Sequence, residues 1–201
     1  VKTASIVLAF FLASSCGTSD SGNPMFEMIP VTFSKNDSKI SLIDRDGNLI
    51  LEDEFPTDSR IVMREGIITE YTKKDEVKYH VIKGKNLQPI GSEKYAYGTP
   101  FFEGFAVVRM ENGMLSLIDD GGKTVIENLS KVNDENIVLT GIPSEGLIRF
   151  KNEDGLWGYL NTQGVIEINP QFGACENFRD GKARVILADG KFAVIDKKGM
   201  E

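Results

Sequence analysis

The apolar residues of this chain fall in short runs that alternate with polar residues and end at turns containing glycine. Residues 153–172, EDGLWGYLNTQGVIEINPQF, show this pattern and contain the single Trp of the chain. A period of two places Trp157 and Tyr159 on one face of a strand, with Gly158 and Leu160 on the other. No long window over the folded region keeps a period of 3.6 residues, so the sequence predicts many strands and only few, short helices.

The stretch at Trp157 is one of five similar copies. Each copy begins with a large apolar residue and runs through apolar positions into a turn, and these first residues are Ile40, Tyr79, Leu115, Trp157 and Phe192. The next residue is Gly, Ala or Ser in four of the five copies. From Leu115 onward the copies are 42 and then 35 residues apart, which indicates a repeated unit of about that length.

An acidic residue followed by glycine forms a second landmark. Gly104, Gly146 and Gly181 each follow Glu or Asp, and each stands nine residues before another glycine. A fixed spacing between turn residues, kept while the connecting segments vary, is typical of repeated supersecondary units. After this pair each unit is predicted to form three antiparallel strands, joined by turns whose glycines provide the positive φ of tight hairpins.

A unit of this size cannot bury its own apolar face, so neighbouring units must stack. We expect the large residue at the Trp position to fill the layer between units. The small residue after it lets a backbone or a bulky side chain approach from the other face. The predicted core positions of the repeat are Leu115, Trp157, Gly158, Tyr159, Phe192 and the turn glycines Gly104, Gly146 and Gly181.

At these residues the chain resembles the WG-repeat family, also called KWG repeats. The fourth copy carries the resemblance best, through Glu145-Gly146, Trp157-Gly158-Tyr159, Gly164 and Ile168-Asn169-Pro170-Gln171-Phe172. The fifth copy follows it from Asp180-Gly181 to Gly199, whereas the first two copies rest on spacing alone. The resemblance spans residues 26–201. It implies an all-β interaction scaffold, common in exported bacterial proteins, without known catalytic residues to carry over.

The predicted fold is therefore all-β, with tandem antiparallel β-meander repeats of about 35–42 residues stacked as an open or a closed, propeller-like array. About five units occupy residues 25–201, of which the first two are degenerate and the last is incomplete. The fifth copy reaches Glu201 where its third strand is expected to begin. Two explanations stay open: further repeats are missing, or residues 25–29 supply the absent strand and close the array.

The amino-terminal residues are typical of an export signal. Lys2 precedes an apolar stretch over residues 4–13, which is well short of the roughly 20 residues that span a bilayer. The small residues before Cys16 resemble a bacterial lipobox, which implies cleavage of residues 1–15 and acylation of Cys16. Residues 16–24 then form a flexible tether. The alternative is an ordinary secretory signal cut nearby. The lipobox resemblance implies a protein of the cell envelope that is anchored by lipid to a bacterial membrane, on the outer membrane or facing the periplasm.

The net charge and the cysteine content limit the binding partners and the disulfides that the sequence predicts. The formal net charge is -7 and no basic run is present, which disfavours nucleic acid as a partner. The two cysteines are Cys16 and Cys175. If Cys16 is acylated, Cys175 has no disulfide partner, and its small, apolar neighbours indicate a buried side chain.

Motifs for catalysis or cofactor binding are not found. The single histidine, His80, cannot build a histidine-rich metal site, and we interpret it as a solvated or edge-strand residue. The Asp-rich stretches at Asp44 and Asp119 lack the full ligand spacing of an EF-hand calcium loop. No nucleophile elbow, P-loop or Rossmann glycine pattern occurs, so we expect a protein without enzymatic activity, metal or cofactor.

Three functions remain in competition. The first is a scaffold that binds an envelope protein or glycan, the second is a hydrolase of envelope polymers that uses paired carboxylates, and the third is a spacer without a specific ligand. For the first, stacking should align the hairpin turns along one edge, acidic at one end and basic at the other. The candidate binding residues on these turns are Asp44, Asp46, Asp119, Asp120, Lys197 and Lys198.

Overall fold

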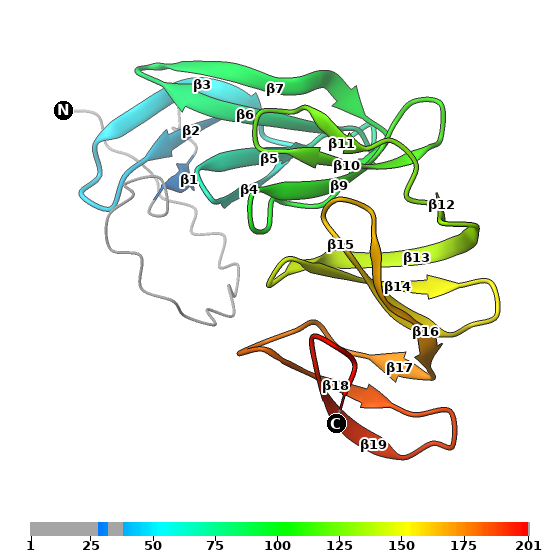
Figure 1. The fold of residues 1–201 in the computed structure, drawn as a ribbon. Helices are drawn as coiled ribbons and strands as arrows, with labels where there is room; N and C mark the ends of the chain where they lie inside the picture. Colours follow the sequence, from blue (N-terminus) through cyan, green and yellow to red (C-terminus); the bar gives the residue numbers. More distant parts are fainter. Residues whose placement is uncertain (1–27, 32–37, 201) are drawn as a thin grey trace. The chain divides into compact units, whose positions relative to one another are not determined.

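The computed structural model describes residues 28–31 and 38–200, and within these ranges the chain forms strands and turns without a helix (Figure 1). The described strands make five antiparallel sheets, which confirms the predicted all-β class. Cys16, with the predicted signal peptide and tether, lies outside the described residues.

The chain divides into two compact units, Val1–Ile90 and Gly91–Glu201, and each is described by itself. The first unit holds a sheet of three strands, β1 (Ile29–Val31), β2 (Lys39–Ile43) and β3 (Leu49–Pro56). Its second sheet contains β4 (Arg60–Arg64), β5 (Ile67–Tyr71), β6 (Val77–Lys83) and β7 (Asn86–Tyr95), whose last residues cross into the second unit. An apolar layer that includes Leu42, Phe55 and Ile68 packs the first unit.

The second unit holds three further sheets in chain order. The first contains β8 (Tyr97–Gly98), β9 (Phe105–Arg109), β10 (Leu115–Asp119) and β11 (Thr124–Ile126). The next contains β12 (Lys131–Val132), β13 (Glu135–Ser144), β14 (Leu147–Asn152), β15 (Trp157–Asn161) and β16 (Ile166–Phe172). The last contains β17 (Ala174–Cys175), β18 (Lys182–Ile186) and β19 (Phe192–Asp196). In each sheet the neighbouring strands are also neighbours in sequence, as a meander requires.

The structure adds one strand to the unit expected from sequence. A strand precedes the acidic-Gly pair in four of the sheets, namely β4, β8, β13 and β17. The acidic residue and its glycine both have positive φ, for example 53° at Glu145 and 80° at Gly146. Positive φ at both central residues is the signature of a type I′ turn, the turn that matches the twist of a hairpin. The pair therefore joins two strands of one unit and does not mark its beginning.

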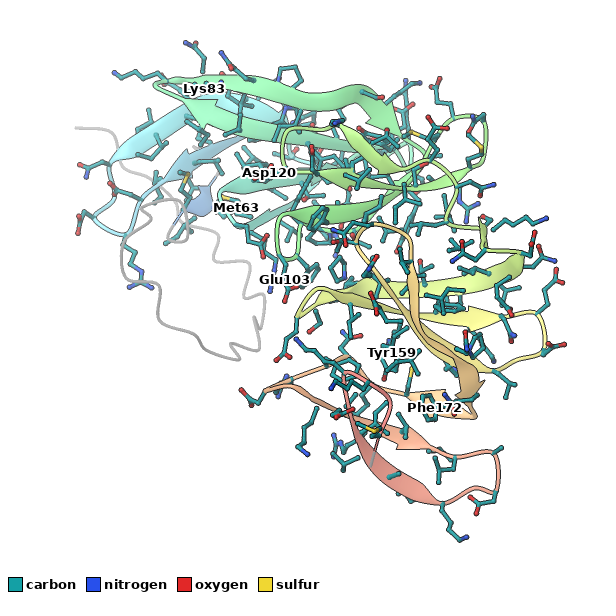
Figure 2. The ribbon with its side chains drawn as sticks, in the orientation of Figure 1. Met63, Lys83, Glu103, Asp120, Tyr159 and Phe172 are labelled. Carbon is teal, nitrogen blue, oxygen red and sulfur yellow. The ribbon has the colours of Figure 1, made fainter. Side chains whose placement is uncertain are left out.

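The layers between the sheets of the second unit hold its core. One layer lies between β14–β16 and the sheet of β17–β19, where Tyr159 and Phe172 pack against Phe178 (Figure 2). The rings of Tyr159 and Phe178 meet edge to face with centroids 4.8 Å apart, and the Tyr159 hydroxyl donates to the Glu176 carbonyl at 2.7 Å. Leu160, the next residue of the strand, points into the layer on the other side. Adjacent residues of one strand thus stabilise two different layers.

A glycine follows Trp157 because β16, the next strand of the same sheet, comes too close to this position for a side chain. A Cβ atom on Gly158 would lie 2.6 Å from the Ile168 carbonyl oxygen and 2.8 Å from the Pro170 nitrogen. The β15–β16 register shifts at this place, which brings the bulged backbone inward. Ser41 and Ser116 take the same position in other copies, and their hydroxyls bond to the third strand, at Asp53 and Glu127.

The large residues at the Trp position differ in burial, and one of them corrects the expected core. Leu115 and Trp157 are half-buried against their layers. Phe192 is 84 % exposed, so it fills no layer among the described residues. Phe192 lies on β19, the edge strand of the last sheet. The side of this sheet that carries Phe192 meets no further sheet of the described chain.

Residues 25–29 are the segment that could close the array by adding a strand to the last sheet. Ile29 pairs with Ile43 on β2, so this residue belongs to the first sheet. Residues 25–27 lie outside the described part of the chain.

Candidate functional site

One edge of the second unit gathers two kinds of turn. In a meander, alternate hairpins lie at the same end of the sheet, so the acidic-Gly turn and the turn after the Trp strand share that end. We call this the turn edge. It comprises the turns at residues 103–104, 145–146 and 180–181, and the turns at residues 119–123, 161–165 and 196–200. The Lys197 ammonium, from a turn of the second kind, donates to the Glu145 carbonyl at 3.0 Å, which joins the two kinds directly.

Two glycines of the turn edge hold their turns against the preceding sheet. A Cβ atom on Gly164 would lie 3.4 Å from Ile126, on the last strand of the sheet before it. A Cβ atom on Gly199 would lie 3.2 Å from Ile168, on the last long strand of its own preceding sheet. Because the same contact recurs from sheet to sheet, the turns follow one another in the order of the array.

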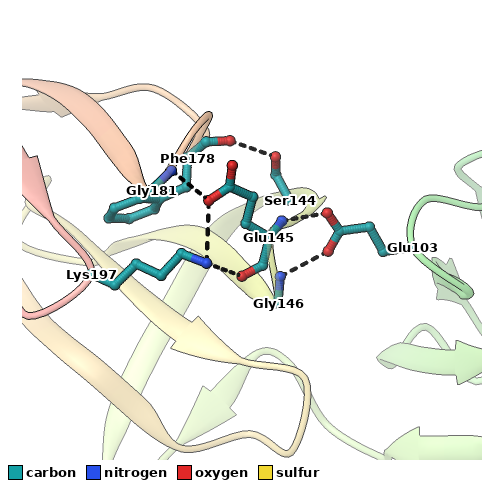
Figure 3. Close-up of polar contacts among 7 residues, drawn as sticks. All are labelled: Glu103, Ser144, Glu145, Gly146, Phe178, Gly181 and Lys197. Carbon is teal, nitrogen blue, oxygen red and sulfur yellow. Dashed lines mark hydrogen bonds and ion pairs between the residues drawn. The ribbon is translucent and has the colours of Figure 1, made fainter. Parts of the chain in front are cut away.

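The acidic residues of the first kind of turn form a ladder between units (Figure 3). The Glu103 carboxylate accepts hydrogen bonds from the backbone N–H groups of Glu145 and Gly146, the second at 2.8 Å. The Glu145 carboxylate in turn accepts the N–H of Gly181 at 2.9 Å. Each acidic side chain therefore caps the turn of the next unit, and sequence reasoning did not assign it this role.

Lys197 and Ser144 reinforce the ladder at its second step. The Lys197 ammonium lies 3.2 Å from the Glu145 carboxylate, and the Ser144 hydroxyl donates to the Phe178 carbonyl at 2.7 Å. Burial raises the pKa of Glu145, but the Gly181 N–H and the Lys197 ammonium outweigh it and hold this pKa below its ordinary value. The carboxylate is thus ionised at neutral pH and committed to contacts within the protein.

Two of the predicted binding residues also have internal partners. Asp119 accepts the N–H groups of Gly121 and Lys123 at 3.1 and 2.8 Å. In the first unit, Asp44 accepts the N–H of Asn48 at 2.8 Å, and hydrogen bonds from the Asn48 side chain and backbone lower the pKa of Asp44. These carboxylates stabilise their own turns, as Asx turns do.

The remaining charged turn residues are directed to solvent. Asp46, in the first unit, is exposed, and Asp120 and Lys198 are exposed on the turn edge of the second. Lys197 is exposed as well but bonds to Glu145. Among the turns after the Trp strand, Asp119 and Asp120 come first, the turn at residues 161–165 is uncharged, and Lys197 and Lys198 come last. The acidic-Gly turns place Glu103, Glu145 and Asp180 on the same edge, so the change from acidic to basic along the whole edge stays a prediction.

The first unit contains one buried polar cluster. The Ser59 hydroxyl donates to one Glu70 oxygen at 2.9 Å, and His80 Nε2 lies 3.2 Å from the other. The Glu70 side chain is 7 % exposed and the His80 side chain 16 %, which corrects the expectation of a solvated His. The carboxylate separates Ser59 from His80, so the cluster lacks the hydroxyl-to-imidazole contact of a nucleophilic triad.

Sequence reasoning missed Glu70. Its signal was an acidic residue within the largely apolar strand IITEY, where only a paired carboxylate is tolerated. The second unit has a buried thiol with a similarly structural setting. Burial raises the pKa of Cys175, which keeps this thiol neutral.

Two further features of the described residues concern metals and membranes. No three His, Cys, Asp or Glu residues in this part of the chain lie together as a group that would hold a metal ion. Nor does this part contain a helix with the length and apolarity needed to cross a membrane.

Comparisons with known proteins identify a repeat in the second unit. The family model described as "WG containing repeat" matches residues 157–192, which confirms the predicted resemblance for that segment. The search of curated proteins gives no match.

Solved structures of low similarity include computationally designed proteins and a bacterial protein. The designed Ika8 protein is 12% identical with a TM-score of 0.46, over 85% of this chain and 55% of that chain. The designed Ika4 protein is 14% identical with a TM-score of 0.42, over 75% and 98%. BamB from Moraxella catarrhalis is 15% identical with a TM-score of 0.40, over 85% and 56%. This chain therefore spans about half the length of the Ika8 and BamB chains.

Proposed function

From the premise that residues 157–192 are a WG-containing repeat within a β-repeat scaffold, we propose that this protein binds a protein or glycan partner in the bacterial cell envelope, without catalysis, through its turn edge. The observation that carries the proposal is the ordered row of turns on the second unit. The turns are held by internal contacts, while Asp120, Gln163 and Lys198 remain exposed between them.

Rigid support of exposed polar groups suits binding. The ladder at Glu103 and Glu145 and the Asx turn at Asp119 fix the turn backbones, so little conformational entropy remains to be lost when a partner orders the exposed side chains. A row of this kind fits an extended polar partner that runs along the units. Electrostatic contacts of exposed charges act mainly on the association rate and weaken with salt.

The disposition of the carboxylates supports a non-catalytic role. A glycosidase needs one acid that can donate a proton and a second carboxylate facing it across the substrate. The carboxylates of Glu103, Glu145 and Asp119 accept backbone N–H groups instead. Glu70 is enclosed with Ser59 and His80.

The proposal also includes export of the protein and its attachment to the membrane. Export rests on the apolar segment at residues 4–13, and attachment to the membrane rests on the lipobox-like residues before Cys16. Two or more acyl chains hold a protein stably on a membrane, whereas one does not. The scaffold would then bind partners that lie near the membrane, at a distance set by the tether at residues 16–24.

The test is capture of partners from envelope extracts at low and high salt. One bait carries Asp120→Ser and Lys198→Ser, which remove one acid and one base from the turn edge. The matched control carries Asp154→Ser and Lys191→Ser, the same charge change on turns at the opposite ends of the strands. We expect the turn-edge variant to lose partners that the native protein and the control retain at low salt. Equal capture by all three excludes the turn edge, and turnover of an envelope polymer by the purified protein establishes the hydrolase instead.

A further inference from the structure

The last described sheet has an apolar face that no other described sheet covers. The register of β17–β19 sets Ala174, Ile186 and Phe192 side by side across the three strands, with Val194 beside Arg184 in the next row. The opposite face, with Ala183, Val185 and Ile195, is packed into the core. Directly opposite residues of neighbouring strands point to the same side, so these two rows share the uncovered face.

Equivalent positions within the array are covered by the next sheet. Val194 is 47 % exposed, whereas Tyr159 and Leu117, which hold the same place in the two preceding copies, are 1 % and 0 % exposed. Phe192 is 84 % exposed, whereas Trp157 and Leu115 are half-buried. The face of β18–β19 is therefore built like faces that elsewhere receive another β-meander sheet.

The first sheet presents the complementary side. The register sets Ile29, Ile43 and Leu49 in one row across β1–β3, on the face opposite to the buried Leu42 and Leu51. Ile29 is 47 % and Leu49 is 44 % exposed. The residues equivalent to Ile43 in the last three copies are at most 1 % exposed, namely Ile118, Leu160 and Ile195.

The charged residues of these two faces differ. Lys182 and Arg184 are exposed on the uncovered face of the last sheet, where Arg184 is paired with Glu176 at 2.8 Å. Glu52 and Glu54 are exposed on β3 of the first sheet, next to the buried Leu51 and Phe55. Lys182 near one apolar row and acidic residues near the other favour a contact between these two faces over contact of either face with itself.

We propose that a second copy of this chain docks head to tail, with the Phe192 face of one copy on the Leu49 face of the next. The contact continues the packing order of the established interface between β14–β16 and β17–β19, where the Tyr159 side of one sheet meets the Ile195 side of the following one. Such a heterologous contact leaves one free face on each end of a dimer, so it extends to larger assemblies.

The test is the mass of the full chain in detergent, measured by light scattering over a range of protein concentrations at a constant, high ratio of detergent to protein. The native protein should grow beyond a dimer as concentration rises. Phe192→Asp and Leu49→Asp should each weaken association by about 30-fold or more, as loss of a central apolar contact does. Both side chains are exposed, so far-UV circular dichroism and melting temperature should stay native. Met114→Asp, at an exposed apolar position on neither face, is the control and should associate as the native protein does.

Mixing the two variants decides the geometry. Each keeps one intact face, so an equimolar mixture should form a dimer with one copy of each and stop there. A native protein that stays monomeric overturns the proposal, as does a mixture that stays monomeric. If Leu49→Asp alone still dimerises, two Phe192 faces meet symmetrically and the head-to-tail contact is wrong. Should an Asp variant fail to fold, Phe192→Ser and Leu49→Ser provide the same comparison.

Discussion

At the scale of single residues, the position after the Trp shows how one constraint takes several side chains. The third strand bulges toward this position, which leaves no room for a Cβ atom at Gly158. In other sheets the gap admits a hydroxyl, and Ser41 and Ser116 bond to the bulged strand. The small residue is thus selected by the distance to a neighbouring strand of the same sheet.

Gly158→Ala and Gly158→Val should destabilise the protein by about 1–3 kcal/mol, with Val the more costly, because the added atoms meet backbone that cannot move aside freely. Denaturant unfolding of both variants measures the free energy change. Gly121→Ala is the control, since its Cβ would meet only the Asp119 side chain at 3.4 Å. A Gly158→Ala variant as stable as this control would contradict the close approach.

Tyr159 and Trp157 should differ in their contribution to stability. Tyr159 is 1 % exposed and bonded to Glu176, so Tyr159→Ala should cost about 3–5 kcal/mol, the range for large aromatic residues in cores. Trp157 is half-buried beneath the Arg149 guanidinium, 5.2 Å from the ring centroid, so Trp157→Ala should cost less, about 1–3 kcal/mol. Denaturant melts compare the two, and equal costs would mean that the Trp ring fills the layer as fully as Tyr159 does.

Glu70 should make the stability of the first unit depend on pH. Its hydrogen bond with His80 lowers the pKa of Glu70, and burial opposes this shift without reversing it. Because the folded pKa lies below the ordinary value of about 4.3, the carboxylate contributes stability that is present above that pH and lost as pH falls through the folded pKa.

Replacement by Gln tests this dependence. Near pH 6, Glu70→Gln should lower the free energy of unfolding by about 1–3 kcal/mol, since a neutral amide replaces the carboxylate to which Ser59 and His80 bond. The deficit should shrink as the pH is lowered below about 4. Thermal melts across this range provide the measurement, with the exposed Glu54→Gln as control. A deficit that stays constant down to about pH 3 would show that the charge of Glu70 is not involved.

At the scale of elements, the hairpin turns both end strands and join sheets. A type I′ turn needs positive φ at two positions, yet the first of them carries an acidic residue at Glu103, Glu145 and Asp180. Glycine would adopt this conformation with less strain. The carboxylates of Glu103 and Glu145 explain the choice, because each reaches the turn of the next sheet.

Loss of one rung should loosen the following turn. Glu145→Ala removes the acceptor of the Gly181 N–H, so hydrogen exchange of that amide should accelerate by about fivefold or more, the effect of losing one hydrogen bond of about 1 kcal/mol. The Gly146 amide, capped by Glu103, should change less and serves as an internal reference. Glu153→Ala, at a turn of the opposite edge, is the matched control. Unchanged exchange at Gly181 would show that the rung contributes nothing to the turn.

At the scale of the whole molecule, repetition supplies the core that no single sheet has. Ile148 and Leu160 close one layer, while Leu147 and Tyr159, their neighbours in sequence, close the next. The sheet of β12–β16 is thus shared between two layers, and its stability depends on both neighbours. The charged turns of the second unit and the exposed side of β17–β19 are directed to solvent.

The predicted lipid anchor of the protein can be tested separately. Cys16 should carry lipid, because an apolar stretch and small residues precede it and a polar tether follows. Intact mass of protein extracted from membranes should show a mature chain that begins at Cys16 and includes acyl groups. A Cys16→Ser variant should remain unacylated and unprocessed at this site. A mature chain that begins elsewhere, or one without acyl mass, excludes the anchor.

The sequence by itself determined the strands, the turns and the repeat, because each depends on residues close together in the chain. Alternation over a few positions assigned Trp157 and Tyr159 to one face, and the glycines between strands marked turns with positive φ, as at Gly155 and Gly164. Even so, the strand ahead of each acidic-Gly pair went unassigned. Strands such as β17 are only two residues long and carry no pattern of their own.

Only the tertiary structure decided what each repeated position does. Glu103 caps a turn 42 residues away, and no local signal connects the two. Trp157 and Phe192 hold the same place in their copies, yet a following sheet covers one and leaves the other exposed. Local patterns set the direction in which a side chain points, whereas burial and partners depend on the sheet that stacks above it.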